Sequence, residues 1–246
     1  MTRRALPESG ILSAPSGASS GWVEHGNSYA GADSAIGYAH STLIVPSNPS
    51  YYYGAAGQVY YTFIGIEPSD GSNILQPVLQ WGNNNAFGGN YWSLAGWSCG
   101  SLCYYSTPAT AYAGDTLAME IFGSSQSWFC SQTPNPQNCW GISVTNVTRS
   151  TGSGLNAADT RLYRWFAAAV EMYDLSDCHQ YPGDPLTYRS ISAWSYYAPG
   201  SSYTSIPILM ASMTFSWGVW TNGGLSLQCS YSAAAAGDSV RLWHHP

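Results

Sequence analysis

The sequence predicts an all-β protein, folded as an antiparallel sandwich or barrel. Its 246 residues include 26 Gly, 14 Pro, 19 Tyr and 11 Trp, whereas only 8% are charged. Aromatic and β-branched residues favour strands, and Gly, Pro, Asn and Ser favour the turns between them. The β-prone runs recur at short intervals with almost no helical periodicity, which is typical of sandwiches and barrels.

The strands are expected in a regular series along the chain. The predicted strands are residues 41–46, 58–66, 73–81, 90–97, 116–122, 140–145, 165–173, 206–220 and 224–230. Clusters of Pro, Gly, Asp and Ser predict turns at 68–71 and 113–115, and a longer turn region at 146–154. His244 and His245 are expected in a solvated tail.

Residues 1–20 are rich in Ser, Pro, Gly and Ala, and they predict a flexible leader. Gly17 to Gly21 formally match the nucleophile motif of hydrolases, but no strand precedes the match and no helix follows it. No change of composition and no linker divides residues 21–246. We therefore expect one β-sandwich domain over 21–246.

Charge and cysteine content narrow the class of protein. The net charge is −6 and the chain contains no Lys. Such a chain could not neutralise a phosphate backbone, so nucleic acid is excluded as a partner. No apolar stretch is long enough to cross a bilayer. The six cysteines suggest disulfides and a secreted protein. Fifteen pairings are possible, and short separations favour Cys99–Cys103 and Cys130–Cys139, leaving Cys178–Cys229.

Other binding and modification signals are few. The Cys99–Cys103 spacing and the isolated His179 do not complete a zinc ligand set, so we expect neither a metal nor another cofactor. Asn146-Val147-Thr148 is a glycosylation sequon and predicts a surface site at Asn146. We expect a monomer.

Two predicted strands carry polar side chains inside apolar runs. Gln76 lies in 73–81 and Glu171 lies in 165–173. A carboxylate in an apolar strand costs free energy unless another group satisfies it or the protein uses it. Strand alternation places Ala167 and Ala169 on the same face as Glu171, and these small residues leave room beside it.

At these residues the chain resembles the glutamic peptidases, or eqolisins, which are secreted acid endopeptidases. The matching segments occur in the family's order. They are Trp22 with Gly26 and Gly31, Val45-Pro46-Ser47, 62–67, Ile74-Leu75-Gln76, 91–97, 114–117, Asn146 to Gly152, and 169–173. The resemblance covers about residues 22–220. It implies a sandwich of two bent antiparallel sheets with the architecture of concanavalin A-like lectins and glucanases, and a substrate groove on the concave sheet.

The resemblance also implies a mechanism and a substrate. Glu171 would act as general base and then general acid on a water held between it and Gln76, whose amide would stabilise the oxyanion. The substrate would be a polypeptide, contacted by Phe63, Glu67, Trp92 and Trp97. Five positions depart from the family. Its Trp and Asp in the segment matched to 62–67 fall on Phe63 and Glu67, its acidic residues in the aromatic stretch fall on Trp92 and Gly96, and the first Glu of the glutamate strand falls on Ala167.

Other readings of the same residues remain open. Glu171 could be a structural strand glutamate bonded to Tyr, Arg161 or Arg164, and Gln80 is a rival glutamine on the face of Gln76. The chain could be a catalytically inactive homologue, or a lectin-like module that binds sugars through exposed Trp and Tyr. A glycosidase would need paired carboxylates, for which Glu120 and Glu171 are the strand-borne candidates.

Overall fold

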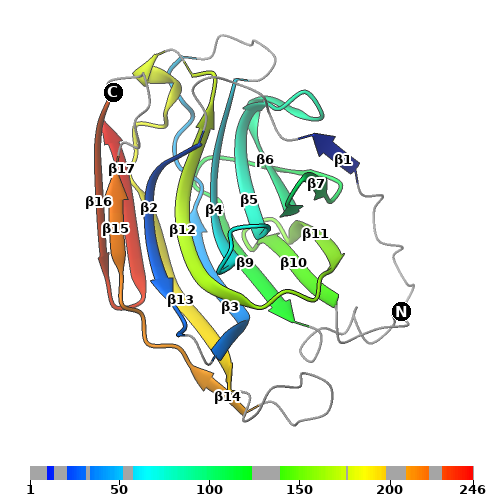
Figure 1. The fold of residues 1–246 in the computed structure, drawn as a ribbon. Coiled ribbons are helices and arrows are strands. Elements are labelled where there is room, and N and C mark those ends of the chain that lie inside the picture. The colour runs from blue at the N-terminus through cyan, green and yellow to red at the C-terminus, as the bar shows by residue number, and fades with distance from the viewer. Residues whose placement is uncertain are drawn as a thin grey trace.

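The computed structural model describes residues 10–13, 21–31, 34–51, 58–123, 139–175, 177–197, 209–221 and 229–245. Within these ranges the chain forms two large sheets, and every strand pairing is antiparallel. The sheets face each other as two layers, and the long strands are bent (Figure 1). The predicted antiparallel β-sandwich is confirmed.

The first sheet has the strand order β1-β7-β6-β5-β4-β12-β2-β15, and β8 pairs with β6. Its strands are β1 (Gly10–Ser13), β2 (Gly21–Tyr29), β4 (Val59–Pro68), β5 (Ile74–Asn83), β6 (Gly88–Cys99), β7 (Leu102–Tyr105), β8 (Ala109–Ala111), β12 (Tyr163–Tyr173) and β15 (Gly218–Thr221). Strand β1 falls inside the predicted leader, pairs with β7 and forms one edge of the sheet. The remainder of residues 1–20 lies outside the described residues.

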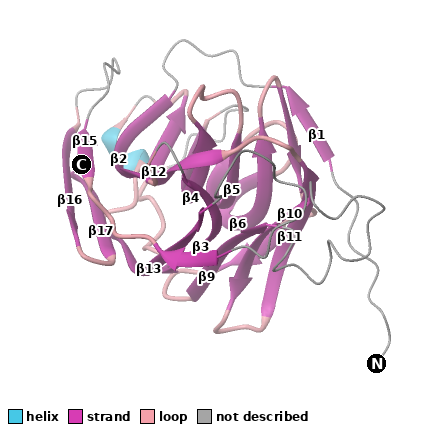
Figure 2. Cartoon of the chain, turned by 60° about the horizontal axis from the view of Figure 1, so that its bottom comes forward, coloured by secondary structure: helices cyan, strands magenta, loops and turns pink. Residues whose placement is uncertain are grey.

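The second sheet has the order β11-β10-β9-β3-β13-β17-β16, and β14 pairs with β13. Its strands are β3 (Ser34–Ile44), β9 (Thr116–Gly123), β10 (Cys139–Asn146), β11 (Thr151–Ala158), β13 (Leu186–Tyr197), β14 (Leu209–Ser212), β16 (Ser230–Ala236) and β17 (Ser239–His245). One short 3-10 turn, η3 (Cys178–Gln180), interrupts the strands and is drawn in cyan in Figure 2. No helix of the described residues is long and apolar enough to cross a membrane.

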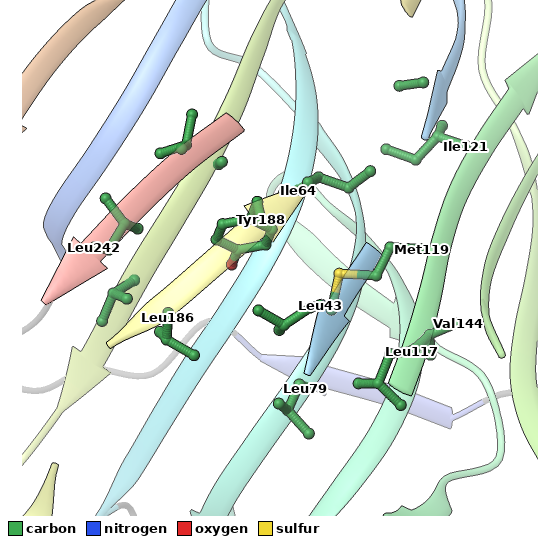
Figure 3. Packing of buried hydrophobic residues seen from close by; sticks show 14 of the residues in the cluster. Leu43, Ile64, Leu79, Leu117, Met119, Ile121, Val144, Leu186, Tyr188 and Leu242 are labelled. Carbon is green, nitrogen blue, oxygen red and sulfur yellow. The ribbon is translucent and has the colours of Figure 1, made fainter. Parts of the chain in front are cut away.

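The core lies between the two sheets. Ile64 and Leu79 project into it from the first sheet and meet Leu43, Met119 and other apolar side chains from the second (Figure 3). These side chains are buried, and removal of their apolar surface from water is the main driving force for the sandwich. A second apolar cluster covers the outer face of the first sheet, away from this core.

Several strands were not predicted. Residues 151–154 belong to β11, although their Gly and Ser content predicted a turn. Strands β13 and β17 were also missed, and the 206–220 prediction divides into β14 and β15. His244 is fully buried in β17, so the prediction of a solvated tail there is wrong. Most of the predicted strand 224–230 lies outside the described residues.

Two of the three predicted disulfides are confirmed. Cys99 is bonded to Cys103 and Cys178 to Cys229, with Cα–Cα distances of 4.1 and 5.6 Å. Cys139 is also disulfide-bonded. Its predicted partner Cys130 lies outside the described residues, so that pairing stays a prediction.

The glycosylation prediction at Asn146 is contradicted by its surroundings. Asn146 has no exposed surface, and its Nδ2 atom donates a hydrogen bond to Asp115 Oδ2 at 2.7 Å. The backbone N–H of Arg149 donates to Asn146 Oδ1. Because Nδ2 is the atom that a glycan would modify, the folded chain cannot carry one there without breaking this network. The sequon closes the β10–β11 turn instead.

Candidate functional site

The candidate site lies on the outer face of the first sheet, where β5, β4 and β12 run side by side. In the register of these strands, Glu171 pairs with Tyr61 and Tyr61 pairs with Gln80. Residues that pair across strands share a face, and residues two apart along a strand share it too. Glu67, Gln76, Gln80 and Glu171 therefore all project from the outer face.

Glu171 is the half-buried carboxylate that the sequence singled out. The Tyr173 hydroxyl donates a hydrogen bond of 2.5 Å to Glu171 Oε1. Burial raises the pKa of Glu171 to about 6, and the hydrogen bond from Tyr173 partly offsets that rise. The proposed structural partners Arg161 and Arg164 do not hold it: Arg161 binds Asp159 and Ser72, and Arg164 Nε is buried with no partner among the described residues.

Gln76 is buried on β5, with 7% of its surface exposed. Its Oε1 atom has no hydrogen-bond partner among the described residues. A buried amide oxygen without a partner is costly, and such atoms often serve a ligand or a water. The amide of Gln76 is thus available for chemistry on the outer face.

The register does not bring Gln76 and Glu171 together as adjacent residues. Ala167 pairs with Gly65, and the β4–β5 register on both sides of Gly65 places Gln76 opposite it. Glu171 lies four residues further along β12. At strand spacings of about 4.8 Å and a rise of about 3.3 Å per residue, their Cα atoms would be roughly 16 Å apart in a flat sheet. The expected adjacent dyad is not found, and Ala167 occupies the position level with Gln76.

The rival glutamine, Gln80, is level with Glu171 but is already engaged. Its Nε2 atom donates to the carbonyl oxygens of Gly82 and Phe87, and its Oε1 atom accepts from Asn84 Nδ2 at 3.0 Å. These bonds hold the β5–β6 turn in place. Gln80 is therefore a structural residue.

Glu67 is a second carboxyl group on the same face. Burial, and secondly the negative charge of Glu171, raise the pKa of Glu67 to about 7. Six residues separate the levels of Glu67 and Glu171 along the sheet. Gln76 lies between these levels on the neighbouring strand. Glu67, Gln76 and Glu171 thus form the polar centre of the outer face.

The other predicted substrate contacts are buried. Phe63 has no exposed surface and packs edge-on against Trp22, whereas Trp97 is 3% exposed beneath Phe87 and Tyr105. Trp92 projects into the core, where it contacts Tyr60 and Trp81, so its predicted role in substrate binding is wrong. Gly96 has the same orientation, and a Cβ atom there would lie 2.6 Å from the carbonyl oxygen of Ile142.

The Glu120–Glu171 pair proposed for a glycosidase is also excluded. Glu120 lies on β9 of the second sheet, between the core residues Met119 and Ile121, and accepts a hydrogen bond from Tyr38. Its side chain therefore points away from the core, on the opposite side of the sandwich from Glu171. The carboxyl group that does interact with Glu171 is Glu67.

Two further features bear on where a ligand could bind. Among the described residues, no three His, Cys, Asp or Glu side chains are grouped in a way that could hold a metal ion. A cavity of about 610 Å³ lies along β10 and β11, but its lining holds no titratable side chain. It is remote from Glu171 and offers no acid–base chemistry.

Sequence reasoning missed the aromatic flank of the site. Trp22 is the register partner of Glu171, and His25 pairs with Ala169 and with Trp220 of β15. The His25 ring lies between the two indoles, with centroids 5.1 Å from each. Tyr173, which holds Glu171, was also not assigned a role. Tyr173 lies two residues after Glu171 and therefore on the same face of the strand, which is the sequence signal that could have identified it.

Comparison with solved structures identifies the fold as that of the glutamic peptidases, or eqolisins. The chain is similar to scytalido-glutamic peptidase bound to a peptide-based transition-state analogue, with 15% identity, a TM-score of 0.55, and coverage of 92% of this chain and 99% of the other. SCP-B, an eqolisin in complex with the tripeptide Ala-Ile-His, gives the same four values. No family model and no curated protein sequence matches the chain. At this identity the likeness establishes the fold, which is a divergent form of the eqolisin sandwich.

Proposed function

We propose that this protein is a secreted, acid-acting endopeptidase that hydrolyses polypeptides on the outer face of the first sheet. The observation that carries the proposal is the half-buried Glu171, with a pKa raised to about 6, on the same face as Gln76, whose amide oxygen has no partner among the described residues. The fold shared with peptide-bound glutamic peptidases and the two disulfides support it.

In this proposal Glu171 is the general base. Its ionised carboxylate takes a proton from water as the water oxygen attacks the carbonyl carbon of the peptide. The Gln76 amide donates a hydrogen bond to the oxyanion, an interaction that can lower a barrier by about 3 kcal/mol. The leaving nitrogen needs a proton, and Glu171, protonated after it has taken the proton of the water, passes that proton on. In a flat sheet the register would keep Gln76 and Glu171 from contacting one water, so this mechanism requires that the bend of the strands bring both side chains to the same peptide bond.

A matched set of variants tests this assignment. An unfolded protein is digested at several pH values between 3 and 7 with the wild type, Glu171→Gln, Gln76→Ala and, as a control, Glu120→Gln. We expect Glu171→Gln to abolish cleavage, Gln76→Ala to reduce kcat by roughly two orders of magnitude, and Glu120→Gln to cleave as the wild type does. Equal cleavage by wild type and Glu171→Gln would remove Glu171 from the mechanism.

A second candidate function is a paired-carboxylate glycosidase, because Glu67 and Glu171 are two carboxyl groups with raised pKa values on one face of the first sheet. Glycosidases use one protonated and one ionised carboxyl group about 5–10 Å apart, and different pKa values for the two groups suit that chemistry. Hydrolysis of a panel of β-glucans and chitin oligosaccharides, lost in both Glu67→Gln and Glu171→Gln, would identify this function. The peptide-bound structures of the same fold favour the peptidase.

A further inference from the structure

An aromatic platform flanks Glu171 on the side of β2 and β15. It consists of Trp22, His25 and Trp220, which lie side by side across the two strands. The imidazole of His25 and the indole of Trp220 are inclined by 30° with centroids 5.1 Å apart, so the two rings partly overlap while 40% of Trp220 stays exposed. Trp22 extends this surface to Phe63 at the centre of the sheet.

The platform is open at its outer end. Trp220 is 40% exposed, and every residue of β15 is exposed. Two residues further along the strands, Gly218 pairs with Asn27 and Asn27 pairs with Ala167. Of these three neighbours of the platform, only Asn27 carries a sizeable side chain. An exposed indole with small residues beside it leaves room for a flat group to stack.

The chemistry of the platform selects an uncharged, flat ligand group. Burial lowers the pKa of His25, which keeps its ring neutral to a lower pH than that of a solvated histidine. Neutral aromatic faces pack well against aromatic rings in offset or edge-on arrangements. None of the side chains that pair with the platform residues in the register carries a charge, except Glu171 at its inner end.

We propose that Trp22, His25 and Trp220 form a specificity subsite that binds an aromatic side chain of the polypeptide substrate. This inference rests on the proposed peptidase function and adds the substrate class. Trp220 lies two strands from Glu171, or about 10 Å across the sheet, a span that about three residues of extended peptide cover. The aromatic side chain therefore belongs two to three residues from the bond that is cleaved.

Peptide libraries test the subsite directly. The protein is incubated with a mixture of peptides of varied sequence, and cleavage sites are mapped by mass spectrometry. We expect enrichment of Phe, Tyr or Trp at a single position, two or three residues from the cleaved bond. For a matched pair of peptides with Phe or Ala at that position, the wild type should prefer Phe by about tenfold or more in kcat/KM.

Trp220→Ala should remove this preference by lowering kcat/KM for the Phe peptide about tenfold or more. Trp194→Ala is the control, because Trp194 is equally exposed but lies on the second sheet. A preference that survives in Trp220→Ala, or that is lost equally in Trp194→Ala, overturns the assignment. Circular dichroism confirms that each variant is folded.

A binding experiment separates failure of the subsite from failure of the peptidase proposal. The Glu171→Gln variant is titrated with the same Phe and Ala peptides while tryptophan fluorescence is recorded. Tighter binding of the Phe peptide that depends on Trp220 supports the subsite even if no peptide is cleaved. Equal binding of both peptides, together with Trp220-dependent binding of cellohexaose or chitohexaose, would overturn it in favour of a sugar platform.

Discussion

Gln76 lies level with Ala167, with Gly65 of the intervening strand β4 between them, and not level with Glu171. The family's first strand glutamate corresponds to Ala167. The position level with Gln76 on β12 thus holds an alanine and no carboxylate. Its nearest acidic groups, Glu67 and Glu171, flank Gln76 along the sheet.

Restoring a carboxylate at position 167 should increase activity. In Ala167→Glu the new side chain would share the outer face with Gln76 across the single intervening strand β4, about 10 Å between Cα atoms, so that two long side chains could contact one water. We expect acid cleavage of an unfolded protein to rise at least tenfold above the wild type. Ala167→Gln, which has the same size without the charge, should show no rise. Equal rates in both variants and the wild type would mean that position 167 is not part of the reacting centre.

Removing the hydroxyl of Tyr173 should move the acid limb of the pH–rate profile upward. The Tyr173 hydroxyl stabilises ionised Glu171 and holds its pKa down. In Tyr173→Phe that bond is absent, and a hydrogen bond to a charged group corresponds to a shift of about one pH unit. The limb that reports deprotonation of the base should shift up by that amount in kcat/KM. Tyr104→Phe, an exposed tyrosine on β7, should leave the profile unchanged.

Stability should fall as the pH rises from about 4.5 to about 7. Glu67 and Glu171 have folded pKa values of about 7 and about 6, above the unfolded value of 4.5. Between these values the folded state binds more protons than the unfolded state, so each step up in pH costs folding free energy. One pKa unit corresponds to about 1.4 kcal/mol, and we expect a loss of a few kcal/mol. His25, with a lowered pKa, opposes this trend near its own titration.

Urea denaturation at pH 4.5 and pH 7 measures this dependence. The double variant Glu67→Gln/Glu171→Gln should lose most of the difference between the two pH values, because neither glutamine titrates. The prediction is contradicted if the wild type is no less stable at pH 7 than at pH 4.5. It is also contradicted if the wild type and the double variant show the same difference in stability between the two pH values.

The sequence predicted the sandwich because strand formation here follows local composition. Alternating aromatic and aliphatic residues mark β4, β5 and β12, and the turns between them carry Pro, Gly and Asp. Strand β11 was missed because its Gly and Ser residues are poor strand formers alone. Pairing with β10 fixes them, and a Cβ atom at Gly152 would lie 2.7 Å from the carbonyl oxygen of Val144. Tertiary contact, and not propensity, decides that strand.

The site was predicted in its residues but not in its geometry. Alternation correctly gave the faces of Gln76 and Glu171, since the period of two is a property of each strand alone. Which residues of β5 and β12 lie opposite one another depends on how each strand pairs with β4. That pairing cannot be read from the sequence of β5 or β12 alone. Trp92 illustrates the same limit: its spacing from Trp97 is odd, so the two side chains face opposite ways. That spacing was visible in the sequence.

The buried pair of His244 and Glu24 should be among the most sensitive positions in the fold. His244 Nδ1 lies 3.4 Å from Glu24 Oε2, neither side chain is exposed, and the Ser232 N–H donates to Glu24 Oε1. Because β2 and β17 belong to different sheets, this contact joins the two layers. Removal of one partner leaves a buried polar group unpaired, which typically costs about 3 kcal/mol or more.

His244→Ala should therefore lower the free energy of unfolding by that amount at pH 5, where urea titration measures it. The matched control is His179→Ala, whose pair with Asp177 is exposed and should contribute less than about 1 kcal/mol. The double variant Glu24→Gln/His244→Ala should not lose the sum of the single effects, since removal of both ends leaves no unpaired charge. A His244→Ala variant as stable as His179→Ala would show that the pair does not join the sheets, and that aromatic packing from Tyr181 alone secures the end of β17.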